Sequence, residues 1–295
     1  MTNTDVYDIA SLTKIVATLP NVMQEFDQGH LTLETKLKTM LPEAKNSNKA
    51  NATVLDMLTH QARFQPWIPF YKATLDSLNR PSTHFYRTEF SDDFPIHVAD
   101  KLYLRKDYND SIVKTILDSE LLPKKQYKYS DFTFILFKEY LELHSKKSLE
   151  ELAHTNFFEP LGANSIMYNP LRKMNSNRII PTENDTYFRH QLVQGYVHDM
   201  AAAMQGGISG HAGLFANALD VAKVMQMYLQ KGSYGGRTYI SENTFNMFNT
   251  CYFCKDGNRR GVGFDKPQLG NEGPTCGCVS LTSFGHTGFT GTMTW

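Results

Sequence analysis

The sequence predicts a mixed α/β (α+β) fold, in which a sheet packs against a helical region. Two observations predict this class. Segments with apolar residues at three- and four-residue steps recur along the chain before residue 260, and this pattern is typical of amphipathic helices. After about residue 260, Gly, Thr, Val and Phe alternate in a pattern typical of strands. Helices followed by strands favour a layered packing of a sheet against helices.

The first predicted helix spans residues 11–28. Gly29 follows it as a stop signal, and Pro20 lies inside it. Because proline lacks a backbone donor, Pro20 should kink this helix or mark its true limit. The apolar positions that predict the helix are Ile15, Val16, Leu19, Val22, Met23 and Phe26.

A second helix is expected to begin at Thr53, which serves as its N-cap with Asp56 three residues on. Ser241 caps another short helix. Further helices are expected at 109–118, 132–144, 148–158 and 220–230.

Two stretches lack a steady period, and three others predict strands. Residues 61–108 are rich in aromatics, Pro and Asp and should run over the surface, where such excursions often shape a cleft; residues 164–195 are also irregular. The aromatic side chains of the first stretch either line an acyl pocket or cover the core; they are Trp67, Phe70 and Tyr71. The predicted strands are 262–264, 279–284 and 289–295.

Composition limits the class of protein. With 295 residues, of which 41% are hydrophobic, the chain can bury a real core and fits one composite domain or a domain with a sub-domain. Lys+Arg and Asp+Glu number 30 each, and no basic stripe stands out, which argues against a dedicated nucleic-acid binder. No run approaches the roughly 20 apolar residues of a membrane helix, and no signal-peptide pattern is visible at the N-terminus.

Four cysteines gather near the C-terminus: Cys251, Cys254, Cys276 and Cys278. A Cys-x-x-Cys pair followed by a Cys-x-Cys pair could close a tetrahedral zinc site, although the second spacing is unusual for zinc. The same residues could equally form disulfides or stay as thiols. Each alternative gives them a structural role rather than a catalytic one.

The segment from Tyr7 to Lys14 carries the sharpest chemical signal. A serine hydroxyl is a poor nucleophile unless a neighbour accepts its proton. At the start of a helix, Ser11 and Lys14 lie one turn apart on the same face, so the amine lies beside the hydroxyl. A desolvated amine, or one that faces positive charge, has a lowered pKa and can serve as a base. Alone, the pair favours the structural alternative, an N-cap serine followed by an exposed lysine.

Two further segments favour the catalytic interpretation of Ser11 and Lys14. Tyr129-Ser130-Asp131 precedes an apolar helix, and residues 284–291 (Phe-Gly-His-Thr-Gly-Phe-Thr-Gly) lie in the strand-rich end. In this order, the three segments resemble the motif set of the serine β-lactamase and penicillin-binding-protein superfamily. They are most similar to the branch of class C β-lactamases, D-alanyl-D-alanine carboxypeptidases, D-aminopeptidases and esterases. Four other segments also resemble this branch, at 33–42, 53–60, 156–167 and 207–215.

The resemblance implies a fold and a set of roles. The fold is β-lactamase-like: an antiparallel sheet flanked by helices, a mostly helical region, and a cleft between them. Ser11 is acylated, while Lys14 and Tyr129 share the proton transfers. The backbone N–H groups of Ser11 and Phe289 form the oxyanion hole. The remaining site residues, His286, Thr287, Gly288 and Asp131, line the cleft and meet the substrate. No cofactor is implied.

The chain also departs from the pattern of this branch. Asp131 stands where the branch usually has Asn, and a carboxylate cannot donate a hydrogen bond as an amide does. His286 replaces the Lys of class C β-lactamases, which fits the esterase and peptidase members better. After His60, the usual Thr-Ser-Gly is missing, so the resemblance does not predict the conformation of this turn.

The ends of the chain depart from the family as well. Only ten residues precede Ser11 and the chain stops at Trp295, so we expect a single domain over 1–295, truncated at both ends and part of a longer polypeptide. We expect a helical sub-region at about 50–215. The sheet region would lie mainly at 216–295 and would also include the helix at 11–28, which carries the nucleophile. The family implies a periplasmic or extracellular location.

Function is predicted as hydrolysis of an ester or amide bond through a serine-bound acyl intermediate. The substrate would be a small molecule or a peptide; esterase or D-amino-acid peptidase activity comes first and β-lactam turnover second. Two rivals stay open: a catalytically silent domain that binds cell-wall peptides or a partner, and a structural appendage of a larger enzyme. His198, Asp199 and His211 lie near Gly-rich sequence, but no paired spacing favours a metal there over structural hydrogen bonds.

Overall fold

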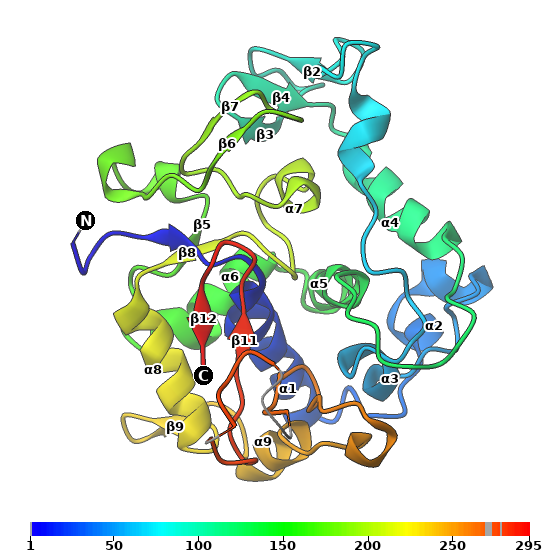
Figure 1. The fold of residues 1–295 in the computed structure, drawn as a ribbon, viewed down its shortest axis with the longest axis vertical. Coiled ribbons are helices and arrows are strands. Elements are labelled where there is room, and N and C mark those ends of the chain that lie inside the picture. The colour runs from blue at the N-terminus through cyan, green and yellow to red at the C-terminus, as the bar shows by residue number, and fades with distance from the viewer. Residues whose placement is uncertain (1, 269–272, 278) are drawn as a thin grey trace.

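Three segments that lie far apart in the sequence form one small antiparallel sheet. The computed structural model describes residues 2–268, 273–277 and 279–295. Strand β8 (Leu214–Ala216) lies between β1 (Tyr7–Asp8) and β5 (Met167–Tyr168). Tyr7 pairs with Ala216, and Met167 pairs with Phe215. The sheet thus holds the N-terminal segment against residues more than 150 positions later (Figure 1).

The predicted helix at 11–28 is divided into three parts. A 3-10 turn (Ala10–Leu12) leads into a π-helical turn (Lys14–Thr18), and the α-helix α1 spans only Leu19–Asp27. Pro20 lies in the first turn of α1, where a helix needs no backbone donor. The proline therefore marks the true start of the α-helix, one of the two outcomes that the sequence allowed.

The other predicted helices form at or near their expected positions. Side chains of Thr53, Ser148, Asn217 and Ser241 accept backbone N–H groups at the helix starts, which satisfies otherwise free donors. The predicted helix at 148–158 is split, because α6 continues into a π-helical turn (His154–Phe158). The α-helices are α2 (Leu37–Met40), α3 (Val54–Leu58), α4 (Tyr108–Asp118), α5 (Phe132–Ser145), α6 (Leu149–Ala153), α7 (Met200–Met204), α8 (Ala218–Leu229) and α9 (Glu242–Phe248). Among the described residues, none of these is long and apolar enough to cross a membrane.

The two stretches without a period contain short strands. Strands β2 (Tyr86–Arg87), β4 (Leu102–Leu104) and β3 (Ile96–Ala99) form a second antiparallel sheet, in that order. Residues 164–195 supply β5 and the antiparallel pair β6 (Glu183–Asp185) and β7 (Gln191–Val193). In Figure 1 both small sheets lie at one end of the molecule, away from α1 and α9. Strands this short carry too few residues to show alternation.

The strand predictions after residue 260 are largely wrong. Residues 262–264 form no strand, because Val262 donates its N–H to Phe248 and Gly263 donates to Leu58. The alternation of apolar residues with glycine in this segment reflects burial in a loop, since Val262 and Phe264 pack into the core. Residues 279–284 bend and turn, with Ser283 donating to Ser280. Of 289–295, only β12 (Met293–Thr294) is a strand, and it pairs with β11 (His286–Thr287).

The hairpin β9–β10 completes the described strands, and apolar packing joins the parts. Strand β9 (Ser233–Tyr234) pairs with β10 (Arg237–Thr238) just after α8. One core cluster contains side chains from the first π-helical turn (Lys14–Thr18) and from α1, α5, α8 and α9. Four aromatic rings contact one another within this core: Tyr228, Phe245, Phe264 and Phe284. The fold is therefore of the mixed class that the sequence predicts.

We predict that Gly213→Ala destabilises the protein by about 2 kcal/mol or more. Gly213 has φ 123°, and an added Cβ would lie 2.3 Å from the carbonyl oxygen of Gly207, which is backbone and cannot rotate away. The free energy of unfolding from denaturant titration measures the effect.

Gly235→Ala is the matched control. Gly235 also has positive φ (59°), but an added Cβ meets nothing within 4 Å, so only about 1 kcal/mol should be lost. Equal losses for the two variants would contradict the role given to the close approach at Gly213.

Candidate active site

A strained turn presents Ser11 at the end of β1. Ala10 has φ 46°, in the left-handed region that non-glycine residues rarely adopt. The buried Asp8 carboxylate holds this turn, because it accepts the N–H of Ala10 at 2.8 Å and the N–H of His198 at 2.6 Å. Such strain persists only where the surroundings determine it, and here it turns Ser11 toward a pocket.

Lys14 lies beneath Ser11 and is fully buried. Its Nζ donates to Ser11 Oγ at 2.8 Å and to the carbonyl oxygen of His211 at 3.1 Å. It also lies 2.7 Å from Asp131 Oδ1. A buried ammonium is stable only when it is paired and hydrogen-bonded, and these three partners meet that need.

Tyr129 approaches Ser11 from the other side. Its hydroxyl donates to Ser11 Oγ at 3.1 Å, and its ring lies 5.0 Å from Lys14 Nζ. The ring of the buried His60 packs on it, with centroids 4.6 Å apart. His60 Nδ1 accepts the N–H of Ser130 at 3.2 Å, so His60 helps to orient the Tyr-Ser-Asp segment.

The turn that departs from the family pattern forms without glycine. His60 and Arg63 have φ values of 57° and 63°, so two non-glycine residues occupy the left-handed region. Their contacts hold the turn in place: Lys128 donates its N–H to His60 at 2.9 Å, and Leu122 donates to Arg63 at 2.7 Å. The sequence identified His60 only as part of a family segment and assigned it no role in the site.

The pKa values of the site follow from burial and from its charges. Burial alone would lower the pKa of Lys14, but Asp131 and Tyr129 outweigh it, so this pKa is raised above its ordinary value. The lowered pKa that the sequence allowed for Lys14 is therefore not found, because its nearest charged neighbour is a carboxylate. Burial also raises the pKa of the Tyr129 phenol. Burial, with the positive Arg260 and Lys14, holds the pKa of His286 well below its ordinary value.

The hairpin β11–β12 lies against the turn that carries Ser11. Thr290 Oγ1 donates to the carbonyl oxygen of Asp8 at 2.7 Å, and Thr292 Oγ1 donates to that of Ile9 at 3.2 Å. A Cβ on Gly288 would lie 2.8 Å from the Ile9 oxygen, so only glycine permits this approach. In Figure 1 the hairpin accordingly runs beside the N-terminal segment.

One pocket of about 500 Å³ joins the predicted site residues. Ser11, with Lys14 beneath it, lies in its wall. Of the aromatic residues left open by the sequence, Trp67 lines the pocket and is half exposed, whereas Phe70 and Tyr71 are buried in the core. The lining includes the other predicted residues: Tyr129, Asp131, His286, Thr287, Gly288 and Phe289.

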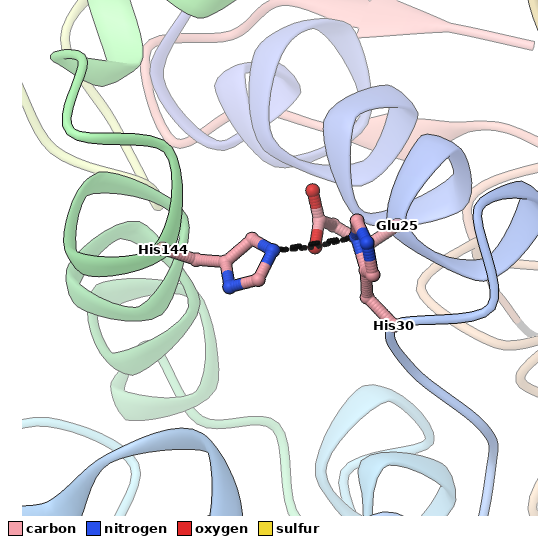
Figure 2. Close-up of side chains that lie close together, drawn as sticks. All are labelled: Glu25, His30 and His144. Carbon is pink, nitrogen blue, oxygen red and sulfur yellow. Dashed lines mark hydrogen bonds and ion pairs between the residues drawn. The ribbon is translucent and has the colours of Figure 1, made fainter.

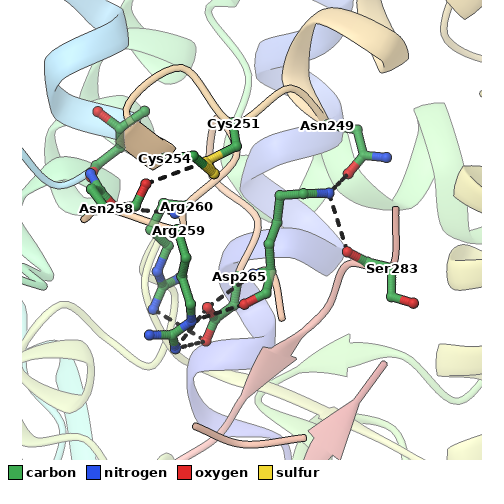
Figure 3. Close-up of a disulfide and its surroundings, with 10 residues drawn as sticks. Asn249, Cys251, Cys254, Asn258, Arg259, Arg260, Asp265 and Ser283 are labelled. Carbon is green, nitrogen blue, oxygen red and sulfur yellow. Dashed lines mark hydrogen bonds and ion pairs between the residues drawn. A yellow bond between two sulfur atoms is a disulfide. The ribbon is translucent and has the colours of Figure 1, made fainter. Parts of the chain in front are cut away.

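Arg260 also lines this pocket, although no sequence pattern indicated a role for it. The side chain is buried, and its Nε and Nη1 have no hydrogen-bond partner among the described residues. Its guanidinium lies 5.2 Å from the Tyr129 ring centroid. Asp265 faces both Arg260 (3.6 Å) and Arg259 (2.9 Å), so one carboxylate serves two guanidinium groups (Figure 3). Arg260 therefore brings a positive charge to this wall of the pocket.

The histidines that the sequence weighed as metal ligands make hydrogen bonds to protein groups. His211 lies 2.8 Å from Asp199 Oδ1 and 2.8 Å from Ser209 Oγ, and His198 lies 2.6 Å from Glu183 Oε2. Within the described ranges, their side chains belong to no group of three metal-binding donors. Their arrangement follows the structural alternative, in which hydrogen bonds fix the rings beside the pocket.

The cysteine pair nearest to Arg260 is oxidised. Cys251 and Cys254 form a disulfide, with Cα atoms 5.6 Å apart (Figure 3). Their sulfur atoms are thus joined to each other and offer no thiolates, so the structure does not form the zinc site that would need all four cysteines. Cys278, the last member of that set, lies outside the described residues.

Comparisons with known proteins bear on the family of this chain. The Beta-lactamase family model matches residues 1–295. The chain is 28% identical to a putative D-alanyl-D-alanine carboxypeptidase of Escherichia coli (strain K12), over 98% of this chain and 65% of that protein. It is 29% identical to an N-acetylmuramyl-L-alanine amidase of Bacillus subtilis (strain 168), over 98% of this chain and 64% of that protein. The chain thus spans slightly less than two thirds of these curated relatives.

The fold has counterparts among solved structures. A penicillin-binding protein homolog from Caulobacter crescentus superposes with a TM-score of 0.60 at 16% identity, covering 97% of this chain and 72% of that one. At this identity the likeness concerns the fold alone. The family match over the whole chain goes further, and with the structural likeness it supports one conclusion: the chain belongs to the Beta-lactamase family.

Proposed function

We propose that the protein is a serine hydrolase that cleaves ester or amide bonds through an acyl-enzyme. One observation carries this proposal: Ser11 Oγ lies within hydrogen-bond distance of both Lys14 Nζ and Tyr129 OH, beside an open pocket. A nucleophile next to a possible base, with a second proton carrier in contact, is the arrangement that covalent catalysis needs.

The geometry suggests how protons move. In the resting site, the Lys14 ammonium and the Tyr129 hydroxyl both donate to Ser11 Oγ. Such an oxygen is not activated, so Lys14 must first release a proton to solvent. Neutral Lys14 then accepts the Ser11 proton as Oγ attacks the substrate carbonyl carbon. The oxyanion would be held by the backbone N–H groups of Ser11 and Phe289. Tyr129 would pass a proton to the leaving group, and water would then release the acyl group from Ser11.

The pocket favours substrates with an anionic group. Because the pKa of His286 is lowered, its imidazole is neutral and supplies no charge. Arg260, which shares Asp265 with Arg259, supplies the positive charge on this wall. A peptide with a free C-terminal carboxylate would meet this charge, in keeping with relatives named as a carboxypeptidase and an amidase. We therefore place D-amino-acid peptidase activity first, ahead of simple esters and of β-lactam hydrolysis.

A periplasmic or extracellular location belongs to the same proposal. The disulfide between Cys251 and Cys254 supports it, because disulfides persist in oxidising compartments and are rare in reducing ones.

A second candidate is a silent binding domain that retains the pocket without turnover. The ion pair between Lys14 and Asp131 favours it, because a paired ammonium cannot accept the Ser11 proton. The two candidates share the pocket and differ in whether Ser11 forms a covalent bond.

Covalent labelling separates these candidates. We predict that intact-mass analysis after exposure to a fluorophosphonate, and separately to a penicillin, shows the mass gain of a single adduct with at least one reagent. Ser11→Ala should abolish that gain and lower hydrolysis by roughly 10³-fold or more, since the nucleophile is lost. Folded protein that takes up neither reagent would contradict the enzyme proposal and favour the binding domain.

Asp131→Asn should shift the pH dependence of kcat/KM. Activity needs neutral Lys14 and therefore rises as the pH passes upward through the pKa of Lys14. Asp131 raises that pKa, so removing its charge should lower it and move the rising limb about one pH unit or more toward acid. Steady-state rates measured from pH 7 up to about pH 12 follow the shift, because the pKa of Lys14 lies above its ordinary value of 10.5. A limb that stays in place would rule out Lys14 as the group that sets it.

Arg260→Gln should weaken binding of carboxylate-bearing peptides. Loss of a charge-assisted contact should raise KM about tenfold or more, with little effect on a neutral ester of the same acyl group. Arg259→Gln is the matched control, because Arg259 binds the same Asp265 but does not line the pocket. Equal effects of the two substitutions, or equal effects on both substrates, would refute a role for Arg260 in recognition.

A further inference from the structure

Three side chains converge at the ends of two helices, remote in sequence from the motifs of the proposed site. Glu25 lies in the last turns of α1, His30 follows that helix, and His144 lies in the last turn of α5 (Figure 2). His30 Nδ1 lies 3.2 Å from Glu25 Oε2, and His144 Nε2 lies 3.5 Å from the same oxygen. The two ring nitrogens are 3.3 Å apart. The three donor atoms therefore form a nearly equilateral triangle.

This triangle has the size of one face of a tetrahedral metal site. Zinc binds imidazole nitrogen and carboxylate oxygen at about 2.0–2.1 Å, so neighbouring ligand atoms around a tetrahedral ion lie roughly 3.3 Å apart. The observed separations of 3.2, 3.3 and 3.5 Å match this value. A divalent cation centred above the triangle could therefore lie at bonding distance from all three donor atoms.

Hydrogen bonds can use at most two sides of this triangle at once. Each ring nitrogen that faces the triangle either carries one proton or offers one lone pair. If both nitrogens donate to Glu25, their N–H groups converge on one oxygen, and the 3.3 Å contact between the two nitrogens carries no hydrogen bond. If one nitrogen lacks its proton, its lone pair faces the carboxylate. A cation removes this conflict, because it takes a lone pair from all three atoms.

The surroundings resemble the support of a metal site. Tyr140 OH donates to Glu25 Oε2 at 2.9 Å, which would orient the carboxylate. The Tyr140 ring also stacks on His144, with an interplanar angle of 16°. Glu25 is mostly buried, whereas the side chains of His30 and His144 are each 43% exposed. A cation could thus enter from solvent and keep water in its fourth position.

We propose that Glu25, His30 and His144 bind a divalent transition-metal ion of the zinc class. Two imidazoles and one carboxylate favour Zn²⁺ over Mg²⁺ and Ca²⁺, which prefer oxygen ligands. The ion would fasten the end of α1 to the end of α5. Lys14 lies in the π-helical turn before α1, and Asp131 directly precedes α5. The Lys14–Asp131 ion pair thus joins these two segments at their N-terminal ends, and the metal ion would join them at their C-terminal ends. The inference does not depend on the proposed hydrolysis.

The test is zinc binding to the full chain. Metal-free protein without a histidine tag is titrated with ZnCl₂ by calorimetry, without reductant so that the Cys251–Cys254 disulfide stays closed. Wild type should bind one Zn²⁺ at micromolar or lower concentration, and zinc should raise its Tm. His30→Ala and His144→Ala should each weaken binding 100-fold or more and abolish the Tm shift. Tyr140→Phe should weaken binding about tenfold.

His154→Ala is the matched control. His154 is also exposed and lies 4.0 Å from Glu159, but within the described part of the chain it belongs to no group of three possible metal donors, so zinc binding should not change. Circular dichroism of each metal-free variant checks its fold, and the two exposed histidines give independent variants. The proposal is overturned if wild type binds no zinc at tens of micromolar, or if His30→Ala and His144→Ala bind it as wild type does.

Discussion

The burial of one charge constrains the rest of this site. The Lys14 ammonium lies inside the core, where an unpaired charge would cost many kcal/mol. Its three partners come from different parts of the chain: Ser11 from the N-terminal turn, Asp131 from the start of α5, and the His211 carbonyl from the Gly-rich segment before β8. Each segment must therefore reach its place for the charge to be satisfied, so a stability requirement also assembles the reactive groups.

The same requirement sets the chemistry of the resting state. Asp131 stabilises the charged form of Lys14 and so raises its pKa, whereas a base needs the neutral form. An amide at this position would hydrogen-bond to the amine without holding the proton as strongly. Stability of the buried pair and readiness for proton transfer thus oppose each other. In the proposed hydrolase, Lys14 would lose its proton when a substrate enters, whereas in the silent binding domain the Lys14–Asp131 ion pair would persist.

Close backbone approaches give the site its shape. Gly288 lets the β11–β12 hairpin lie against Ile9, and Thr290 and Thr292 fasten it there through the carbonyl oxygens of Asp8 and Ile9. Asp8 in turn holds the strained turn at Ala10. The wall that bears His286 and the turn that bears Ser11 are therefore one hydrogen-bonded unit. Beyond them, Arg260 adds a charge that no local pattern indicated.

The sequence by itself determined most of the longer helices and the motif residues, because helix periodicity, N-caps and the Ser-x-x-Lys spacing are local, but it did not indicate the short helices α2 and α7. It located Ser11, Lys14, Tyr129 and His286, which the fold brings to one pocket or directly beneath it. Only the tertiary structure decided the strands, since pairs of two or three residues have no period and the alternation near Val262 reflects burial in a loop. It also decided the raised pKa of Lys14, the position of Arg260 and the meeting of Glu25, His30 and His144. These features depend on distances between remote segments, which packing sets and sequence spacing does not encode.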